Sequence, residues 1–388
     1  MMQKAQMEDF KKVMVPSPRL NERQNMAFLK SMFPVSVIHG PPGTGKTRTL
    51  SEIGRDAVRK GQGVLCICWT NVAVLKLYEE LRKVIPTKSV GIITSAEYKC
   101  WHESECEDIK ADADVRERQV LCMTLSNYLN QTMDGDSCNK WGPGLLKQRE
   151  VLLSDEISQL WEQEAAMLLQ RLKDYKRLVL GGDDDQLPPY VSRDVDDPPS
   201  MMTWLRRLTG NYQIPVTLLT KQYRMMPSVG SLVSDLFYKG KLLHHKTFDG
   251  RRHLFFHDMK GKMSEKSTSR SCVQDSRRYI EIWSKYRRNY PQWTIQVLTF
   301  YEAQRAHVKR LNTKINVCCV DSFQGQEADL VILLLSVRRC KLSKFMLHRG
   351  RLCVALSRAK GDLHIVGNWD TMFEYNIWEN ILRRCKRL

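Results

Sequence analysis

The sequence predicts an α/β protein built from two parallel-sheet domains. Short β-branched and aliphatic runs alternate with longer amphipathic segments along the whole chain. The runs are continuously apolar, which is typical of strands in a parallel sheet that helices cover on both faces. A break rich in Asp and Pro at 196–200 separates two sets of runs, and 388 residues suit two or three domains.

The predicted strands follow the chain in order. The first set lies at 35–40, 63–69, 89–94, 119–125, 150–156 and 177–183, and the second at 216–220, 253–259, 294–300, 315–322, 330–337 and 363–368. We expect the boundary between Asp194 and Pro215, and set the domains at 1–212 and 213–388. The acidic stretch 99–118 and the Gly-containing stretch 130–149 are expected to be irregular.

Composition excludes several classes of protein. Hydrophobic residues make up 42% and charged residues 27%, as in soluble globular proteins. No apolar run approaches the roughly 18 residues of a membrane span, so we expect no membrane partner. The start of the chain lacks the apolar core of a secretory signal. Twelve Cys without regular pairing predict reduced thiols in an intracellular protein, cytoplasmic or nuclear.

The net charge of +18 lies almost entirely in the second half. Residues 1–200 hold 27 Lys+Arg and 29 Asp+Glu, whereas residues 201–388 hold 34 and 14. A positive field of this kind attracts nucleic acid, acidic proteins or anionic membranes. Charge alone leaves these partners, and a role in solubility, open.

The strongest local signal is a phosphate-binding loop, GPPGTGKT at 40–47. A β-branched run comes before it and a helix-compatible segment follows, so backbone N–H groups at a helix start would wrap phosphates. The predicted nucleotide ligands are Gly40, Pro41, Pro42, Gly43, Thr44, Gly45, Lys46 and Thr47. Lys46 would reach the β- and γ-phosphates of ATP, and the Thr47 hydroxyl would ligate Mg²⁺. A Gly-rich turn without a ligand is the alternative.

An acidic pair follows a strand further along, as phosphate-transfer chemistry requires. Asp155 would hold the Mg²⁺, directly or through water, and Glu156 would orient and deprotonate the attacking water. A bare Asp-Glu pair is usually a solvated turn, but its place behind a strand favours the catalytic interpretation. Loop and pair together predict a P-loop NTPase.

Further motifs identify what the hydrolysis drives. They are LNERQNMA (20–27), WTNVAVLKL (69–77), GDDDQLPP (182–189), QYRMMPSVGSLVSDLFYKGKL (222–242), VDSFQGQEADLVILLLSV (320–337) and GRLCVALSRAK (350–360). In this order the set resembles superfamily 1 helicases, more narrowly the 1B branch of up-frameshift/senataxin-type RNA or DNA helicases. The resemblance runs from about Leu20 to Asn368. It implies two tandem RecA-like domains with ATP in the cleft between them.

The resemblance also assigns roles around the nucleotide. Gln24 would read the adenine edge, Tyr223 would stack on the adenine ring, and Glu327 would bind the ribose hydroxyls. Gln186 would sense the γ-phosphate. A surface Gln on the first helix is the alternative for Gln24, and a turn-capping amide is the alternative for Gln186. For Tyr223 the alternative is a core aromatic, and for Glu327 a surface ion pair.

Two arginines are implied to act from the second domain. Arg224 and Arg358 would approach the γ-phosphate as arginine fingers, with a surface ion pair as the alternative for each. Because Lys46 and Asp155 belong to the other domain, ATP would favour a closed arrangement and hydrolysis would relax it. Repeated closing and opening would move the strand, with 5′ to 3′ polarity by resemblance.

Nucleic-acid contacts are implied on both domains. Hydroxyls and amides bind phosphates and sugars without reading sequence, so the expected partner is single-stranded RNA or DNA. Packing or helix capping stays open for each candidate. The candidates are Thr70, Asn71, Thr124, Thr299, Tyr301, Ser322 and Gln324.

Some features depart from the family pattern. Few residues precede the adenine-reading motif, which predicts little accessory structure, and the sequence is equally compatible with a fragment of a longer protein. An ATP-gated clamp that binds RNA without separating strands is therefore the alternative function. Cys100, His102 and Cys106 match no standard zinc spacing, and the basic end RRCKRL reads as a solvated tail. We expect a monomer.

Overall fold

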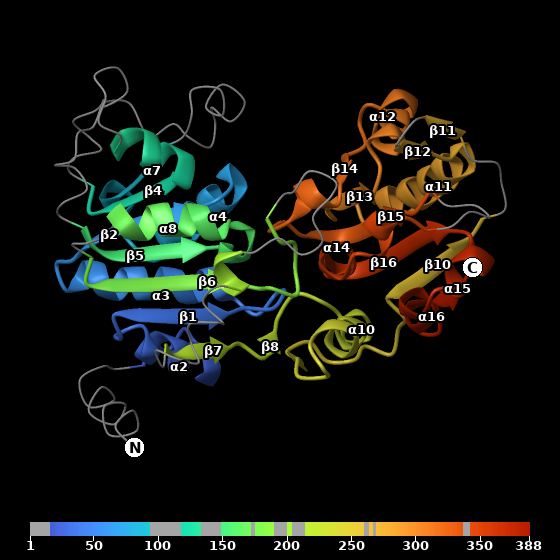
Figure 1. Ribbon diagram of the computed structural model, residues 1–388. Helices are drawn as coiled ribbons and strands as arrows, with labels where there is room; N and C mark the ends of the chain where they lie inside the picture. Colours follow the sequence, from blue (N-terminus) through green and yellow to red (C-terminus); the bar gives the residue numbers. More distant parts are fainter. Residues whose placement is uncertain are drawn as a thin grey trace. The chain divides into compact units, whose positions relative to one another are not determined.

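The computed structural model describes residues 16–93, 118–132, 149–171, 175–189, 200–203, 214–259, 264–266, 269–336 and 342–388. These residues form two compact units. The first comprises 1–41, 45–184 and 188–219, and the second comprises 42–44, 185–187 and 220–388. Each unit is a sheet covered by helices (Figure 1).

The first unit contains a parallel sheet in the order β3-β4-β2-β5-β6-β1-β7. Its strands are β1 (Val35–His39), β2 (Gly63–Cys68), β3 (Val90–Ile93), β4 (Val120–Thr124), β5 (Arg149–Asp155), β6 (Arg177–Gly182) and β7 (Val216–Leu218). Nearly every residue of β2 to β6 is buried, which shows that the sheet lies at the centre of the unit, as the continuous apolar runs predict.

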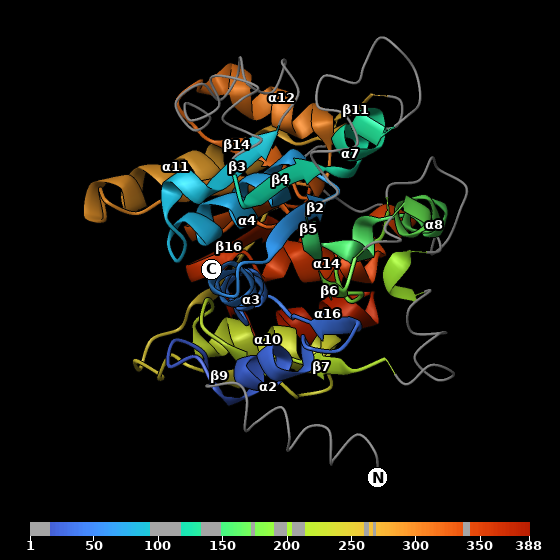
Figure 2. The same cartoon turned by 90° about the vertical axis from the view of Figure 1, so that its left-hand side faces the viewer.

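Helices cover both faces of this first sheet. On one face pack α2 (Glu22–Lys30), α3 (Lys46–Arg59) and α4 (Asn71–Arg82), which bury Phe28, Leu50 and Leu77 against Val64 and Leu153. On the other face pack α7 (Leu125–Thr132) and α8 (Glu162–Arg171). Figure 2 shows α3 and α4 on one side of the strands and α8 on the other.

The second unit also contains a parallel sheet, in the order β14-β13-β15-β16-β10-β17. Its strands are β10 (Leu254–Asp258), β13 (Ile295–Thr299), β14 (Val317–Cys319), β15 (Ala328–Leu334), β16 (Ala359–Gly367) and β17 (Lys386–Arg387). Two short pairs lie outside the sheet: β8 (Lys221–Gln222) with β9 (Leu243–His244), parallel, and β11 (Ser264–Lys266) with β12 (Ser269–Ser271), antiparallel.

Helices cover both faces of the second sheet as well. One layer consists of α11 (Val273–Asn289) and α12 (Glu302–Leu311), with Ile282 and Val308 packed on Val297. The other consists of α10 (Pro227–Phe237), α13 (Lys344–Leu347), α14 (Arg349–Leu356), α15 (Trp369–Phe373) and α16 (Asn376–Leu382). Short 3₁₀ turns at Thr87–Ser89, Ile157–Gln159 and Asp321–Phe323 complete the elements.

The structure confirms the α/β class but differs from two expectations. The run at 216–220, expected in the second set, forms β7 and pairs with β1, so the first unit extends to Leu219 rather than 212. The expectation for this run is wrong because the sequence of a short strand does not indicate which sheet the strand joins. The end of the chain is solvated in its side chains, as expected, but its backbone is ordered, because Lys386 and Arg387 pair with β10.

Several other expectations concern residues outside the described part of the chain. Cys100, His102 and Cys106 lie there, as do most of 99–118 and 130–149. The described part holds eight cysteines, all free thiols. Among the described helices none is long and apolar enough to cross a membrane.

Candidate functional site

The phosphate loop follows the carboxyl end of β1 and leads directly into α3. Gly45 caps the helix with φ +79°, and Gly43 has φ +71°, values that favour glycine. A Cβ on Gly40 would lie 2.6 Å from Lys46 Cβ, so the turn is too tight there for any larger residue. The first backbone N–H groups of α3 can therefore donate hydrogen bonds to an anion held in this turn.

Lys46 and Thr47 meet the acidic pair at the end of β5. Lys46 Nζ donates to Asp155 Oδ1 at 2.5 Å and lies 3.0 Å from Glu156 Oε1. The Thr47 hydroxyl donates to Asp155 Oδ2 at 2.7 Å. All but Glu156 are at least nine-tenths buried. The four residues, predicted from two separate motifs, thus lie within one cluster.

The electrostatics of this cluster favour the charged forms of Lys46 and Asp155. Burial alone would raise the pKa of Asp155, but the charge of Lys46 and hydrogen bonds from Lys46 and Thr47 lower it overall. Burial would likewise lower the pKa of Lys46, but Asp155 and Glu156 raise it well above its usual value. A charged lysine beside two carboxylates has the donor and acceptor set that Mg²⁺ and phosphate oxygens need.

Glu156 adopts an unusual backbone conformation at this point. Its φ is +57°, in the left-handed region that non-glycine residues rarely occupy. The preceding carboxylate holds it, since the Glu156 N–H donates to Asp155 Oδ1 at 2.9 Å. Such local strain is common in residues whose side chain must point in one particular direction.

Gln24 lies against the phosphate loop. A Cβ on Gly45 would be 2.5 Å from Gln24 Nε2, and Gln24 is 3% exposed. Its Oε1 accepts from the Asn21 N–H at 2.9 Å, and its own N–H donates to Asn21 Oδ1, which makes a capping box for α2. Gln24 is thus a buried capping residue rather than a surface side chain, and the adenine contact stays a prediction.

One polar group beside the loop was not predicted from the sequence. His39 Nε2 lies 3.1 Å from Asp183 Oδ1 and 3.3 Å from Asp184 Oδ1, at the carboxyl ends of the adjacent strands β1 and β6. The sequence held a signal for this group, because His39 ends one apolar run and Asp183 directly follows another.

In the second unit, Arg224 is buried and heavily bonded. Its Nε donates to Glu327 Oε2 at 2.6 Å and its Nη1 donates to the carbonyl of Ser357 at 3.1 Å. The Glu327 side chain is 44% exposed, so it faces outward while it pairs with the arginine. The structure thus joins the QYRM, GQE and VALSRAK motifs at Arg224.

Arg358 is only 1% exposed. Its guanidinium donates to the carbonyls of Val354 and Gln326 and to Ser357 Oγ. It also donates to Gln186 Oε1 at 3.1 Å; residues 185–187 group with the second unit. The acceptors of these four bonds are uncharged oxygens.

Tyr223 is half-buried and tilts against His245, with ring centroids 4.8 Å apart. It belongs to none of the hydrophobic core clusters of the described residues, which argues against a purely structural aromatic. Stacking on adenine remains a prediction.

Two of the three nucleic-acid candidates of the first unit, both threonines, make helix caps. Thr70 caps α4 by accepting from the Ala73 N–H, with Asn71 as the first helical residue. Thr124 Oγ1 accepts from the Asn127 N–H at 3.2 Å. The capping alternative is present at both threonines, and contact with nucleic acid stays a prediction.

Those of the second unit lie around the ends of β13 and β14. Thr299 Oγ1 accepts from the Tyr301 N–H, and the Tyr301 hydroxyl bonds to Ser343 Oγ. Ser322 is exposed and donates to the carbonyl of Cys319, whereas Gln324 is largely buried. Ser322 is thus the most accessible of these four.

The chain is similar to known proteins over most of its length. A family model described as an AAA domain matches residues 24–192, and a second with the same description matches residues 201–370. The chain is 28% identical to a regulator of nonsense transcripts 1 homolog of Arabidopsis thaliana over 95% of its length, and 28% identical to ATP-dependent helicase NAM7 of Saccharomyces cerevisiae over 90%. It spans 34% and 41% of these two relatives.

Solved structures show the same fold. An arterivirus nonstructural protein 10 (helicase) in complex with DNA superposes with a TM-score of 0.51 at 15% identity, over 92% of this chain and 65% of that one. The helicase of PRRSV gives a TM-score of 0.50 at 18% identity, over 90% and 55%.

Proposed function

Because the chain belongs to the superfamily 1 helicases, we propose that it hydrolyses ATP to move along single-stranded nucleic acid. The observation that carries this proposal is the cluster of Lys46, Thr47, Asp155 and Glu156 at the carboxyl ends of parallel strands.

Each member of the cluster has a distinct task. Lys46 exchanges its bonds to the two carboxylates for phosphate oxygens, while the start of α3 contributes backbone N–H groups. Thr47 and Asp155 hold Mg²⁺, which neutralises charge on the phosphates when bound. Glu156, freed from Lys46, orients the attacking water and accepts its proton.

The second unit contributes the remaining groups. Arg224 and Arg358 stabilise charge at the γ-phosphate and Gln186 senses it, while Tyr223 stacks on the adenine. Gln24, from the first unit, reads the adenine edge. Glu327 binds the ribose. Since the two sets of groups belong to different units, bound ATP favours a closed arrangement and its hydrolysis relaxes it, which moves the strand 5′ to 3′.

The nucleic-acid contacts follow from the candidate hydroxyls and amides. Thr70, Asn71 and Thr124 contribute from the first unit, and Thr299, Tyr301, Ser322 and Gln324 from the second. The excess of basic residues after position 200 adds salt-dependent affinity for RNA or DNA. The protein acts as a monomer.

The test is the steady-state ATPase rate without polymer, with single-stranded RNA and with single-stranded DNA, at matched low salt. We expect at least about tenfold stimulation by one polymer. Binding of polymer without stimulation would instead favour a clamp, and absence of turnover under all conditions would refute the proposal. A tailed duplex then tests strand separation.

A further inference from the structure

We propose that Lys246 is a positioning residue that fixes the two arginine-bearing segments relative to each other, an inference that rests on the proposed role of Arg224 and Arg358. Lys246 lies in the stretch after β9 and belongs to none of the motifs above. Its Nζ donates to the carbonyl of Arg224 at 2.6 Å and to the carbonyl of Lys360 at 2.7 Å. It therefore bonds the main chain of both segments at once.

The acceptors explain why this contact is specific. An ammonium group has three donors, and here two go to backbone carbonyls that are far apart in sequence. Both carbonyls belong to short segments whose own side chains are the proposed fingers. Lys246 is half-buried, and charge-assisted bonds to carbonyls in such a place are stronger than those between neutral groups.

The charges around Lys246 have opposing effects. Burial and the nearby charge of Lys360 lower the pKa of Lys246, and Glu327 and Asp329 partly offset this. Lys360 itself pairs with Asp329 at 2.9 Å, which takes up part of its charge.

His244, in the same stretch as Lys246, also acts on the turn that contains Arg224, through the side chain of Gln222. Gln222 Oε1 accepts from the N–H groups of Arg224 and Met225, and its Nε2 donates to the carbonyl of Met225. The Gln222 Nε2 also donates to His244 Nδ1 at 3.0 Å, which leaves His244 Nε2–H to donate to Ser231 Oγ at 3.1 Å. His244 thus fixes the amide that shapes the turn.

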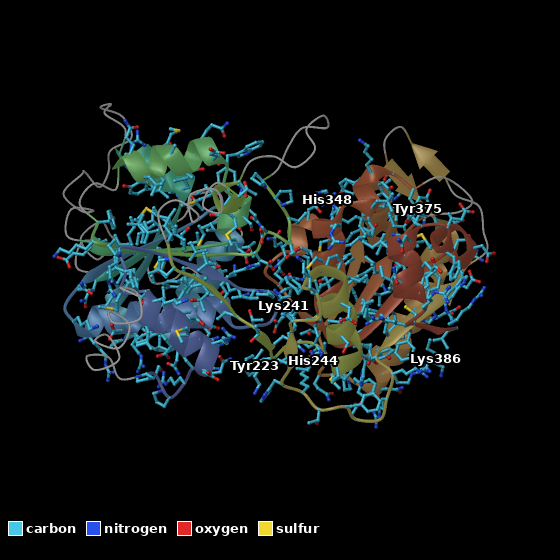
Figure 3. All side chains as sticks on the ribbon, turned by 60° about the horizontal axis from the view of Figure 1, so that its bottom comes forward. Tyr223, Lys241, His244, His348, Tyr375 and Lys386 are labelled. Carbon is cyan, nitrogen blue, oxygen red and sulfur yellow. The ribbon has the colours of Figure 1, made fainter. Side chains whose placement is uncertain are left out.

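The two stretches lie side by side. Strand β8 precedes the arginine turn and pairs with β9, which precedes Lys246. Tyr223 and His244, labelled in Figure 3, come from these two neighbouring stretches. A Cβ on Gly230 would lie 2.7 Å from the His244 ring, so α10 packs closely behind the histidine.

Lys246 also completes a closed set of contacts. Arg224 Nη1 already bonds the carbonyl of Ser357, the residue before Arg358. Lys246 adds the second tie, from the Arg224 carbonyl to the Lys360 carbonyl, on the other side of Arg358. With one hydrogen bond the Arg224 segment and the 357–360 segment could rotate relative to each other, whereas two bonds on either side of Arg358 fix their orientation.

The first test is Lys246→Met, which keeps the aliphatic stem and removes the donors, with Lys246→Arg as the conservative variant. Lys241→Met is the matched control, because Lys241 is exposed on the same stretch. We expect Lys246→Met to lower kcat about tenfold while the Kd for ATP changes less than about twofold. Lys246→Arg should recover at least about half of the lost rate, and Lys241→Met should match wild type.

A double-mutant cycle with Arg358→Ala separates positioning from general destabilisation. If Lys246 acts through the arginines, its loss should cost clearly less in the Arg358→Ala background than in wild type. Equal fold losses in both backgrounds, or unchanged kcat in Lys246→Met alone, would overturn the proposal.

Hydrogen exchange provides a readout that does not depend on turnover. In Lys246→Met, amides of 222–226 and 357–360 should exchange faster, with those of β15 unchanged. Unchanged exchange in both segments would overturn the positioning role, even if the wild-type protein showed no ATPase. Absence of wild-type turnover with faster exchange in the variant would refute only the proposed function.

Discussion

His257 Nε2 lies 2.7 Å from His364 Nδ1 inside the second unit, and both imidazoles are buried. Arg278 Nε donates to His257 Nδ1, so the single proton of His257 is on Nε2 and points to His364. His364 Nε2–H then donates to the Tyr286 hydroxyl, which donates to Asp362. An arginine at one end and a carboxylate at the other thus set the tautomer of both histidines.

This hydrogen-bonded series of side chains predicts that the folded protein loses stability in mild acid. Burial and then Arg278 lower the pKa of His257 to about 4. Burial, then His257, Lys285 and Arg278 lower that of His364 to about 3. Above pH 6.5 both histidines are neutral in folded and unfolded chains alike, and the full stability is present. Between pH 6.5 and about 4 the unfolded chain takes up protons at these histidines and the folded chain does not, so stability falls by at most about 1.4 kcal/mol per pH unit for each histidine.

Thermal unfolding between pH 7.5 and 4.5 checks this prediction. His364→Phe should lower the Tm at pH 7.5 but give a shallower fall toward acid than wild type. His245→Ala is the control, because His245 is exposed, and it should keep the wild-type slope. Parallel curves for wild type and His364→Phe would show that the hydrogen-bonded series does not cause the pH dependence.

Lys46→Ala should abolish ATP hydrolysis, by more than about a hundredfold, because it removes the cation beside Asp155 and Glu156. The circular dichroism spectrum should stay that of the folded protein. Lys60→Ala, near the exposed end of the same helix, is the control and should keep wild-type turnover. Normal hydrolysis in Lys46→Ala would remove the phosphate loop from the mechanism.

Glu156→Gln should bind ATP normally yet hydrolyse it about a hundredfold more slowly, because an amide cannot accept the proton of the attacking water. Fluorescent-nucleotide binding and single-turnover hydrolysis measure the two effects separately. Glu79→Gln, on an exposed face of α4, should change neither. Weakened binding with an unchanged rate would assign Glu156 to ligand binding instead.

Arg358→Ala should retain ATP binding and slow hydrolysis by about a hundredfold or more, since a finger acts on transition-state charge. Removing this buried guanidinium also frees the carbonyls of Val354 and Gln326, so the Tm should be measured beside the rate. The exposed Arg288→Ala is the matched control. Turnover at the wild-type rate in Arg358→Ala would exclude a finger at this position.

The sequence predicted those parts of the molecule that local pattern determines. The strands β2 and β15 are continuous apolar runs, and both are buried where the runs predict. Lys46 lies in a motif of fixed spacing and Asp155 in an acidic pair behind a strand, and the structure brings these two residues together. Strand β7 was placed in the wrong set because its partner β1 is distant in sequence.

Other features had no local signal. Lys246 bonds two carbonyls, and main-chain acceptors leave no trace in residue identity. The pairing of Glu327 with Arg224 joins two motifs that the sequence treats separately. Similarly, the histidines of β10 and β16 meet only through strand register, with Phe255 opposite His364.

The edges of the two sheets bear on how the protein avoids aggregation. An open sheet edge offers unpaired backbone groups to another molecule. The second sheet ends on one side with β17, whose two residues are both exposed cations, and on the other with the three-residue β14. The first sheet ends with the three-residue β7. The other edge of the first sheet, β3, is also short, at four residues. Because short or positively charged edges offer little surface for a second chain to add a strand, these edges disfavour association by sheet extension.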